Sequence, residues 1–232
     1  MYEYYDRIKA ELYAAADEKY NEFNSKIVNS EYRTVGVRMP VIKKLARSVP
    51  LENRAEAVDA FFADPDKTFE LITLFGIIAA RKGDYAQTRE YLKRIIPIFG
   101  SWAHVDCVIP CLSWVDTDVF LHDFSYLLDR EGQYEIRSYI IYLFDCLTDE
   151  RINFVLDTLK SVRYGDYYVD MAAAWLLAEC LVKFYDKTLP LFRSPTFPRF
   201  VHNKAIQKAR ESFRIDVQTK EYLNTLKIKP QK

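Results

Sequence analysis

The sequence predicts an all-α protein, a HEAT-like helical-repeat solenoid built of antiparallel helix pairs. Apolar residues recur at helical spacing nearly throughout the 232-residue chain, and strand-like alternation is hard to find. Helix stop and start signals recur about every 13 to 20 residues, a normal helix length. The chain has only 6 glycines against 17 tyrosines and 15 phenylalanines, which indicates regular elements rather than glycine turns.

The first third of the chain predicts helices separated by two breaks. Residues 4–28 are expected to form one continuous helix. Residues 35–40, Val-Gly-Val-Arg-Met-Pro, predict a tight turn whose final proline begins the next helix. Residues 64–81 predict a helix that opens with an Asp N-cap followed by proline at its first position.

The middle of the chain carries clear capping signals. Asp84 and Gln87 form a capping-box-like start for a helix that runs toward Phe99. Ser101 is the expected cap of a helix that begins at Trp102. Later helix junctions are expected at residues 116–117, 132–133, 148–149 and 165–166.

The spacing of these signals favours stacked helix pairs. Two helices with their turns occupy roughly 30 to 40 residues, the size of a HEAT-type unit. A compact bundle is the alternative architecture, but about ten or eleven short helices stack more easily as pairs. No segment resembles a linker, so a single domain over residues 1–232 is expected. Residues 167–180 are apolar almost all round, which predicts a helix buried between its neighbours.

Composition excludes several classes of protein. No apolar run reaches the roughly 18 residues of a membrane span, and no secretory signal opens the chain. The four cysteines, Cys107, Cys111, Cys146 and Cys180, form no CxxC pair. They are interpreted as reduced core thiols of a cytoplasmic protein, and no metal site is expected.

The charge is balanced overall but unevenly distributed. The 33 basic and 33 acidic residues give no global attraction to nucleic acid. Residues 183–232 nevertheless hold 12 Lys and Arg against 4 Asp and Glu, so this tail carries +8 and the rest −8. A basic tail suits a polyanionic partner, and a solvated basic end helix is the alternative.

A few side chains stand out as candidates for chemistry. Trp102 and Asp106 lie four residues apart and therefore share one helix face. By default, such a pair is a core tryptophan and a surface aspartate. Trp175, in the apolar helix, is by default a packing residue, and Arg137 is by default an exposed helix charge. No nucleophilic triad, phosphate loop or dinucleotide fingerprint is found.

The order of these features carries more information than any one of them. The succession of residues 35–40, then Ser-Trp-Ala-His-Val-Asp at 101–106, then Arg137, then Ala-Ala-Trp-Leu-Leu at 173–177 resembles the AlkD family of HEAT-like DNA alkylation repair glycosylases. The resemblance runs from about residue 13 to residue 213.

The resemblance implies roles for particular residues. In this family a tryptophan and an aspartate four residues later, with a second tryptophan on a later helix, line the site that faces the damaged nucleotide. These roles fall on Trp102, Asp106 and Trp175. Arg137 matches a family arginine that faces the DNA backbone, and Arg38 occupies the turn position beside the family's glycine and proline.

The activity that the resemblance implies is hydrolysis of the N-glycosidic bond of N3- or N7-alkylated, cationic purines in double-stranded DNA. Asp106 would stabilise the developing oxocarbenium charge and position the attacking water. No metal, organic cofactor or base-flipping pocket is implied. The concave face that bears the site is expected to be electropositive, with Arg137, Lys204 and Lys208 contributing.

An alternative function rests on departures from the family pattern. Typical members have two helices before the turn, and the second touches DNA; one continuous helix over residues 4–28 would leave that helix out. The arginine that often follows the later tryptophan is replaced here by Ala178, then Glu179, which would repel DNA. The alternative is a non-catalytic HEAT-like protein with a protein partner on its concave face. A nucleotide reader that uses the two tryptophans for stacking is a third reading. No role is assigned to the loop at residues 193–198.

Overall fold

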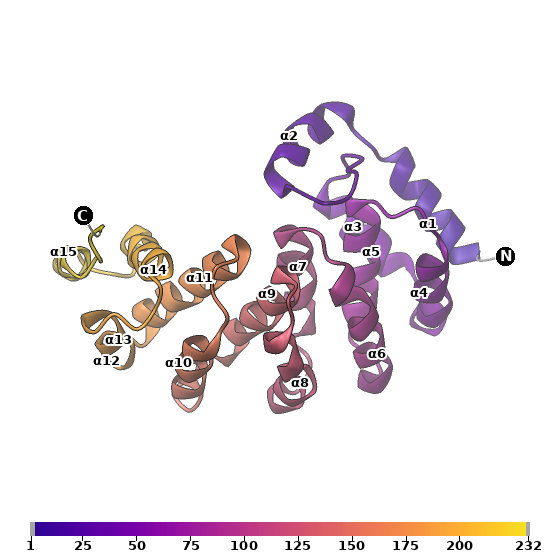
Figure 1. Cartoon of the computed structure of the whole chain (residues 1–232). Helices are drawn as coiled ribbons and strands as arrows, with labels where there is room; N and C mark the ends of the chain where they lie inside the picture. The colour runs from indigo at the N-terminus through magenta and orange to yellow at the C-terminus, as the bar shows by residue number, and fades with distance from the viewer. Residues whose placement is uncertain (1–2, 231–232) are drawn as a thin grey trace. The chain divides into compact units, whose positions relative to one another are not determined.

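The computed structural model describes residues 3–230, and over these residues the chain forms helices and turns with no strand (Figure 1). The all-α prediction is confirmed. The helices group into two compact units, Met1–Asp116 and Thr117–Lys232. A single domain therefore stays a prediction. Over residues 3–230, no helix combines the length and apolarity that a membrane span requires.

Unit 1 is built around one fully buried helix, α5, which packs against its neighbours in the chain. All twelve residues of α5 are buried, and α3, α6 and α7 each pack against it. The helices of unit 1 are α1 (Glu3–Ala14), α2 (Glu18–Val28), α3 (Met39–Ser48), α4 (Arg54–Ala63), α5 (Phe69–Ala80), α6 (Tyr85–Ile95) and α7 (Trp102–Val108).

The expected helix over residues 64–81 begins later than the sequence predicts. Thr68 is the N-cap of α5, and its hydroxyl accepts a hydrogen bond from the Leu71 amide at 3.3 Å. The predicted cap, Asp64, instead accepts hydrogen bonds from Tyr5 at 2.5 Å and Lys9 at 2.6 Å. The Asp64 side chain thus ties α1 to the end of α4, and the prediction of a cap there was wrong.

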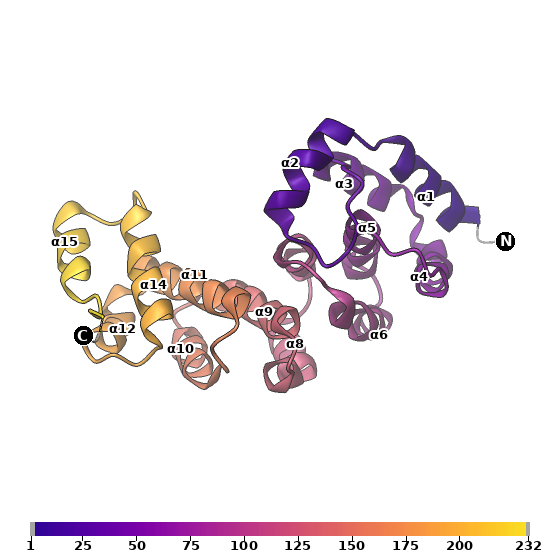
Figure 2. The same ribbon diagram turned by 45° about the horizontal axis from the view of Figure 1, so that its top comes forward.

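The prediction of one continuous helix over residues 4–28 was also wrong. The chain leaves helical geometry after Ala14, and Asp17 caps a separate helix, α2, by accepting a hydrogen bond from the Tyr20 amide at 3.0 Å. Helix α2 lies beside the start of α3 (Figures 1 and 2). Two helices therefore precede the turn, so the helix that the sequence indicated as missing is present.

The turn at residues 35–37 is held by a buried carboxylate. Glu70, in the first turn of α5, has no exposed surface and accepts hydrogen bonds from three consecutive backbone amides. The distances are 3.0 Å from Val35, 2.8 Å from Gly36 and 3.4 Å from Val37. Arg38 then adopts an extended conformation and α3 begins at Met39, so the predicted turn into a helix is confirmed.

Unit 2 has a row of three neighbouring helices, in which α11 packs against both α9 and α14 (Figure 2). The four alanines of α11 are buried, as the close approach of its neighbours requires. The helices of unit 2 are α8 (Thr117–Phe124), α9 (Gln133–Tyr142), α10 (Ile152–Ser161), α11 (Tyr167–Lys183), α12 (Tyr185–Thr188), α13 (Pro190–Arg193), α14 (Arg199–Glu211) and α15 (Val217–Thr225).

Within each unit, helices packed on helices form the core, as a helical-repeat solenoid of the HEAT type requires. The expected junctions at residues 116–117, 132–133 and 165–166 match the starts of α8, α9 and α11, while α10 begins three residues after the fourth junction. The predicted Asp84 cap is confirmed, with the Gln87 amide donating to the Asp84 carboxylate at 2.7 Å.

Replacing the buried carboxylate should weaken unit 1. We expect Glu70→Gln to lower the free energy of unfolding by about 3 kcal/mol, because the amide nitrogen of glutamine cannot accept hydrogen bonds from buried amides. Urea unfolding followed by circular dichroism measures this, with Glu56→Gln on the exposed side of α4 as the matched control. Equal stability of the two variants would show that Glu70 does not hold the turn.

Candidate functional site

The first residues of α7 hold the end of α2. The Ser101 hydroxyl accepts from the Ala103 amide at 3.1 Å, which confirms the predicted cap, and donates to the Val28 carbonyl at 2.6 Å. The indole Nε1 of Trp102 donates to the Ile27 carbonyl at 3.2 Å. The carbonyl groups that a helix leaves unpaired at its C-terminus are thus satisfied by α7, and the Trp102 ring is fixed against α2.

His104 is a structural residue of this junction. Its Nδ1 accepts from the Gly100 amide at 3.1 Å, and its Nε2 lies 3.0 Å from the Phe69 carbonyl, which requires a proton on Nε2. Burial lowers the pKa of His104 to about 4, so the ring is neutral at physiological pH. His104 therefore connects α7 to the start of α5, and both of its nitrogens are engaged.

Trp102 borders a small apolar hollow in unit 1. The hollow has a volume of about 190 Å³ and is lined by Tyr20, Asn24, Ile27, Val28, Val37, Met39, Phe69, Trp102, Ala103 and Cys107. Asp106 lies one helical turn after Trp102 on the same face of α7, and both side chains are half-buried. The structure thus keeps the predicted pair together and partly accessible to solvent.

Cys107, the thiol nearest to this pair, is not a nucleophile. Burial and, to a lesser extent, the neighbouring Asp106 carboxylate raise its pKa to about 11. The thiol is therefore protonated at neutral pH, where only a thiolate would react. Carboxylate and aromatic chemistry, not cysteine chemistry, is what this part of unit 1 can supply.

Arg38 lies at the opposite end of α2. Its side chain is exposed, pairs with Asp17 at 3.3 Å, and places its guanidinium 4.3 Å from the centre of the Tyr20 ring. Arg38 therefore contacts Tyr20, one of the α2 residues that line the hollow beside Trp102. Its role as a DNA-binding residue stays a prediction.

Helix α2 itself is the feature that sequence reasoning missed. Its outer surface is partly apolar and mixed in charge: Phe23 is 64% exposed, Ile27 is 46% exposed, and Glu18, Lys19, Glu22 and Lys26 are also exposed. The only local signal was Asp17, a residue type that favours the N-cap position.

In unit 2, Trp175 lies on the surface rather than in the core. It is 40% exposed and packs against the ring of Phe144, with 4.6 Å between ring centres. The default interpretation of Trp175 as a packing residue was wrong. It lines a hollow of about 270 Å³ together with Ala178, Glu179, Val182, Lys208, Glu211 and Ser212. The structure thus brings Lys208 close to Trp175.

Glu179 in this hollow is neutralised by an arginine from a later part of the chain. Arg214 donates to both carboxylate oxygens of Glu179, at 2.7 Å and 2.8 Å. The repulsion of DNA that the sequence predicted for Glu179 is therefore largely compensated. The pair is separated by 35 residues, so no local pattern could reveal it.

The other predicted DNA-binding residues differ in accessibility. Arg137 is only 5% exposed and donates to the Tyr168 carbonyl in the first turn of α11 at 2.8 Å. The default of an exposed helix charge was wrong. Its burial argues against direct phosphate contact, and DNA binding by Arg137 stays a prediction. Lys204 on α14 is half-exposed, donates to Gln207 at 3.2 Å and lines a different hollow from Lys208.

Metal-binding side chains do not gather in the described part of the chain. Over residues 3–230, no three His, Cys, Asp or Glu side chains lie close enough to hold a metal ion. The four cysteines are free thiols, and Cys146 and Cys180 are buried.

The model of the DNA alkylation repair enzyme family matches the chain over residues 8–181. The chain belongs to the DNA alkylation repair enzyme family. The resemblance to the AlkD-like proteins is thereby confirmed, and a role in DNA alkylation repair follows from membership. The matched residues include α2, Trp102, Asp106 and Trp175, but end before α14. No curated protein matches the chain significantly.

The buried histidine makes this DNA alkylation repair family member sensitive to acid. The pKa of His104 is lowered to about 4, below its ordinary value of 6.5, so the unfolded chain binds the proton more tightly. The stabilisation is present above pH 6.5 and is lost as the pH falls toward 4, by up to about 3 kcal/mol. We expect the unfolding free energy of the His104→Gln variant to vary less over this window. Parallel pH profiles for variant and wild type would contradict this.

Proposed function

We propose that this protein is a DNA glycosylase that hydrolyses the N-glycosidic bond of N3- or N7-alkylated purines in double-stranded DNA. One observation carries the proposal: in a chain of the DNA alkylation repair family, Trp102 and Asp106 share one partly exposed face of α7. Helix α2, which holds the Trp102 ring in place, lies directly beside them.

The proposed reaction requires a carboxylate and an attacking water molecule. Alkylation at N3 or N7 makes the purine cationic and therefore a good leaving group. As the glycosidic bond breaks, positive charge develops on the sugar, and a fixed carboxylate at Asp106 stabilises it and orients the attacking water. The water adds to the anomeric carbon and the neutral purine leaves with the bonding electron pair. The proton of that water passes to solvent or to Asp106.

Trp102 supplies a binding surface for a cationic nucleotide. The Trp102 ring cannot rotate freely, because its Nε1 is hydrogen-bonded to α2 and its face packs on a cluster formed by Val28, Phe69 and Ala103. Trp175 is proposed as a second aromatic contact to the DNA, from unit 2. Each cation–π contact is worth about 0.5 to 2 kcal/mol. A preoriented ring loses little entropy on binding.

The non-catalytic alternative loses part of its support. It rested on a missing helix before the turn, and α2 occupies that place, with Phe23 and Ile27 exposed on its surface. It rested also on Glu179, which Arg214 neutralises. The neutral net charge still favours it. In this alternative the protein binds a protein partner and has no catalytic activity.

Release of N7-methylguanine and N3-methyladenine from alkylated duplex DNA tests the proposal. We expect Asp106→Asn to lower the single-turnover rate about 100-fold or more, because the amide cannot stabilise the cationic sugar. Trp102→Ala should weaken binding of the lesion, and Trp175→Ala should weaken binding of the duplex. Asp157→Asn, on the exposed side of α10, is the matched carboxylate control and should release base at the wild-type rate.

Wild-type protein that releases neither base, under conditions where it is folded, would refute the glycosylase. Salt-insensitive DNA retention in the same samples would instead support the non-catalytic alternative. If the Asp106→Asn variant still releases the base, the protein is a glycosylase but its catalytic carboxylate is another residue.

The Glu179–Arg214 pair gives a separate test of DNA binding by the Trp175 surface. We expect Arg214→Ala to weaken duplex binding, because it leaves the Glu179 carboxylate uncompensated beside Trp175. Glu179→Gln in the Arg214→Ala background should restore most of the loss. Fluorescence anisotropy at two salt concentrations measures both effects. If the second substitution restores nothing, the pair does not shape this surface.

A further inference from the structure

A groove of about 600 Å³ lies on unit 2, where α14 meets the segment that follows α15. It is lined by Arg199, Phe200, Asn203, Lys204, Gln207 and Lys227. These residues lie outside the matched family region, which ends at residue 181. The groove is therefore a feature of this chain that the family assignment does not explain.

The far wall of the groove is fixed to α14 by hydrogen bonds. The Asn203 side chain pairs with both backbone groups of Ile228, with its Nδ2 donating to the carbonyl at 2.9 Å and its Oδ1 accepting from the amide at 2.9 Å. Arg199 Nε donates to the same carbonyl at 3.2 Å, and His202 Nε2 lies 3.0 Å from the Leu226 carbonyl. The backbone on both sides of Lys227, at Leu226 and Ile228, is thus hydrogen-bonded to α14.

The charge of the groove has a single sign. Its lining includes three cations, Arg199, Lys204 and Lys227, and no carboxylate. Lys204 contacts a neutral partner, the Gln207 amide oxygen, at 3.2 Å. Three of the 12 basic residues of the segment 183–232 thus line one preformed concave surface, which favours an anionic ligand.

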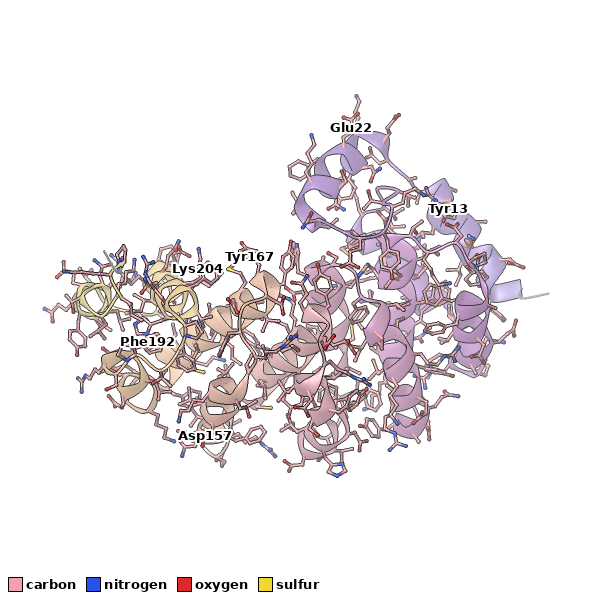
Figure 3. All side chains as sticks on the ribbon, viewed as in Figure 1. Tyr13, Glu22, Asp157, Tyr167, Phe192 and Lys204 are labelled. Carbon is pink, nitrogen blue, oxygen red and sulfur yellow. The ribbon has the colours of Figure 1, made fainter. Side chains whose placement is uncertain are left out.

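The groove also carries exposed aromatic surface. Phe200 is 41% exposed, and Tyr167 beside it on α11 is 59% exposed, with 6.0 Å between the ring centres. Figure 3 shows Tyr167 and Lys204 on the same side of unit 2, with Asp157 on the opposite side. Two accessible rings next to cations provide contacts for a ligand that has both planar apolar groups and negative charge.

We propose that this groove binds a single-stranded segment of nucleic acid. Arg199, Lys204 and Lys227 contact the phosphodiesters, and a base stacks on Phe200 with Tyr167 beside it. The strand must be unpaired, because the bases of a duplex do not expose their faces. An acidic peptide would use the cations but leave the rings without a partner. This inference does not rest on glycosylase activity.

The test is the binding of a fluorescein-labelled, unmodified oligothymidylate of about 12 nucleotides, a length that covers typical strand-binding sites. Anisotropy titrations are made at several salt concentrations with the full chain. We expect Phe200→Ala and Phe200→Leu to weaken binding about 5- to 100-fold, and Phe200→Trp to retain it. The leucine variant keeps apolar bulk, so it separates loss of stacking from loss of folding.

The lysines are tested through the salt dependence. The double variant Lys204→Ala, Lys227→Ala should weaken binding and reduce the slope of log K against log salt by about 1.4, for two phosphate contacts on a single strand. Matched controls in the same unit are Phe154→Ala, an exposed phenylalanine on α10, and Lys160→Ala with Lys187→Ala. Both controls should bind as wild type does.

Three outcomes would overturn the proposal. Wild-type affinity in Phe200→Leu would show that no base stacks there. Displacement of the oligonucleotide by polyglutamate at equal charge concentration would identify the groove as a site for acidic peptides. Tighter binding of a duplex of the same length, unaffected by Phe200→Leu, would identify it as a duplex surface. The oligothymidylate carries no alkylated purine, so failure of the glycosylase proposal is read separately.

Discussion

The structure of unit 1 depends on one buried interaction, between the Glu70 carboxylate and the backbone amides of residues 35–37. A carboxylate without solvent contact is stable only if its oxygens are occupied by donors, and three consecutive amides provide them. This fixes Gly36 at a φ of 83°, a conformation that favours glycine. A Cβ at this position would lie 2.4 Å from the Asp17 carbonyl oxygen, so only glycine permits α2 to dock here.

The candidate site follows from that constraint. The Gly36 carbonyl accepts from the Asp17 amide at 3.0 Å, which holds the start of α2, while Ser101 and Trp102 hold its end. Phe69, next to Glu70, accepts from His104 and so ties α7 to the same end of α5. Trp102 and the exposed surface of α2 are therefore placed by the same few hydrogen bonds. The aromatic ring of the site is rigid because of its neighbours, not because of α7 alone.

Local sequence signals predicted helix ends that depend on neighbouring residues. They failed where contacts between distant parts of the chain determine a helix end or the burial of a side chain. The serine cap before Trp102 was visible because its donor and acceptor lie two residues apart. The turn at residues 35–40 was visible from its glycine and proline alone, although the carboxylate that holds it, Glu70, lies 33 to 35 residues later. The break before Asp17 was not, since it depends on docking to a glycine 19 residues later. The same reason hides the burial of Arg137 under α11 and the pairing of Glu179 with Arg214. The spacing of Trp102 and Asp106 predicted their shared face, because helical periodicity alone determines it.

Net charge is a poor guide to the ligands of this chain. The chain is neutral because the cations of the unit 2 tail are balanced by acidic residues elsewhere. Some of the acidic side chains form ion pairs, such as Asp64 with Lys9 and Glu179 with Arg214. A polyanion responds to the local electrostatic potential, which salt screens beyond about 8 Å at physiological ionic strength, so the nearest side chains determine it. In the α14 groove these are Arg199, Lys204 and Lys227. A neutral protein can therefore bind nucleic acid at one surface while most of its remaining surface does not bind it.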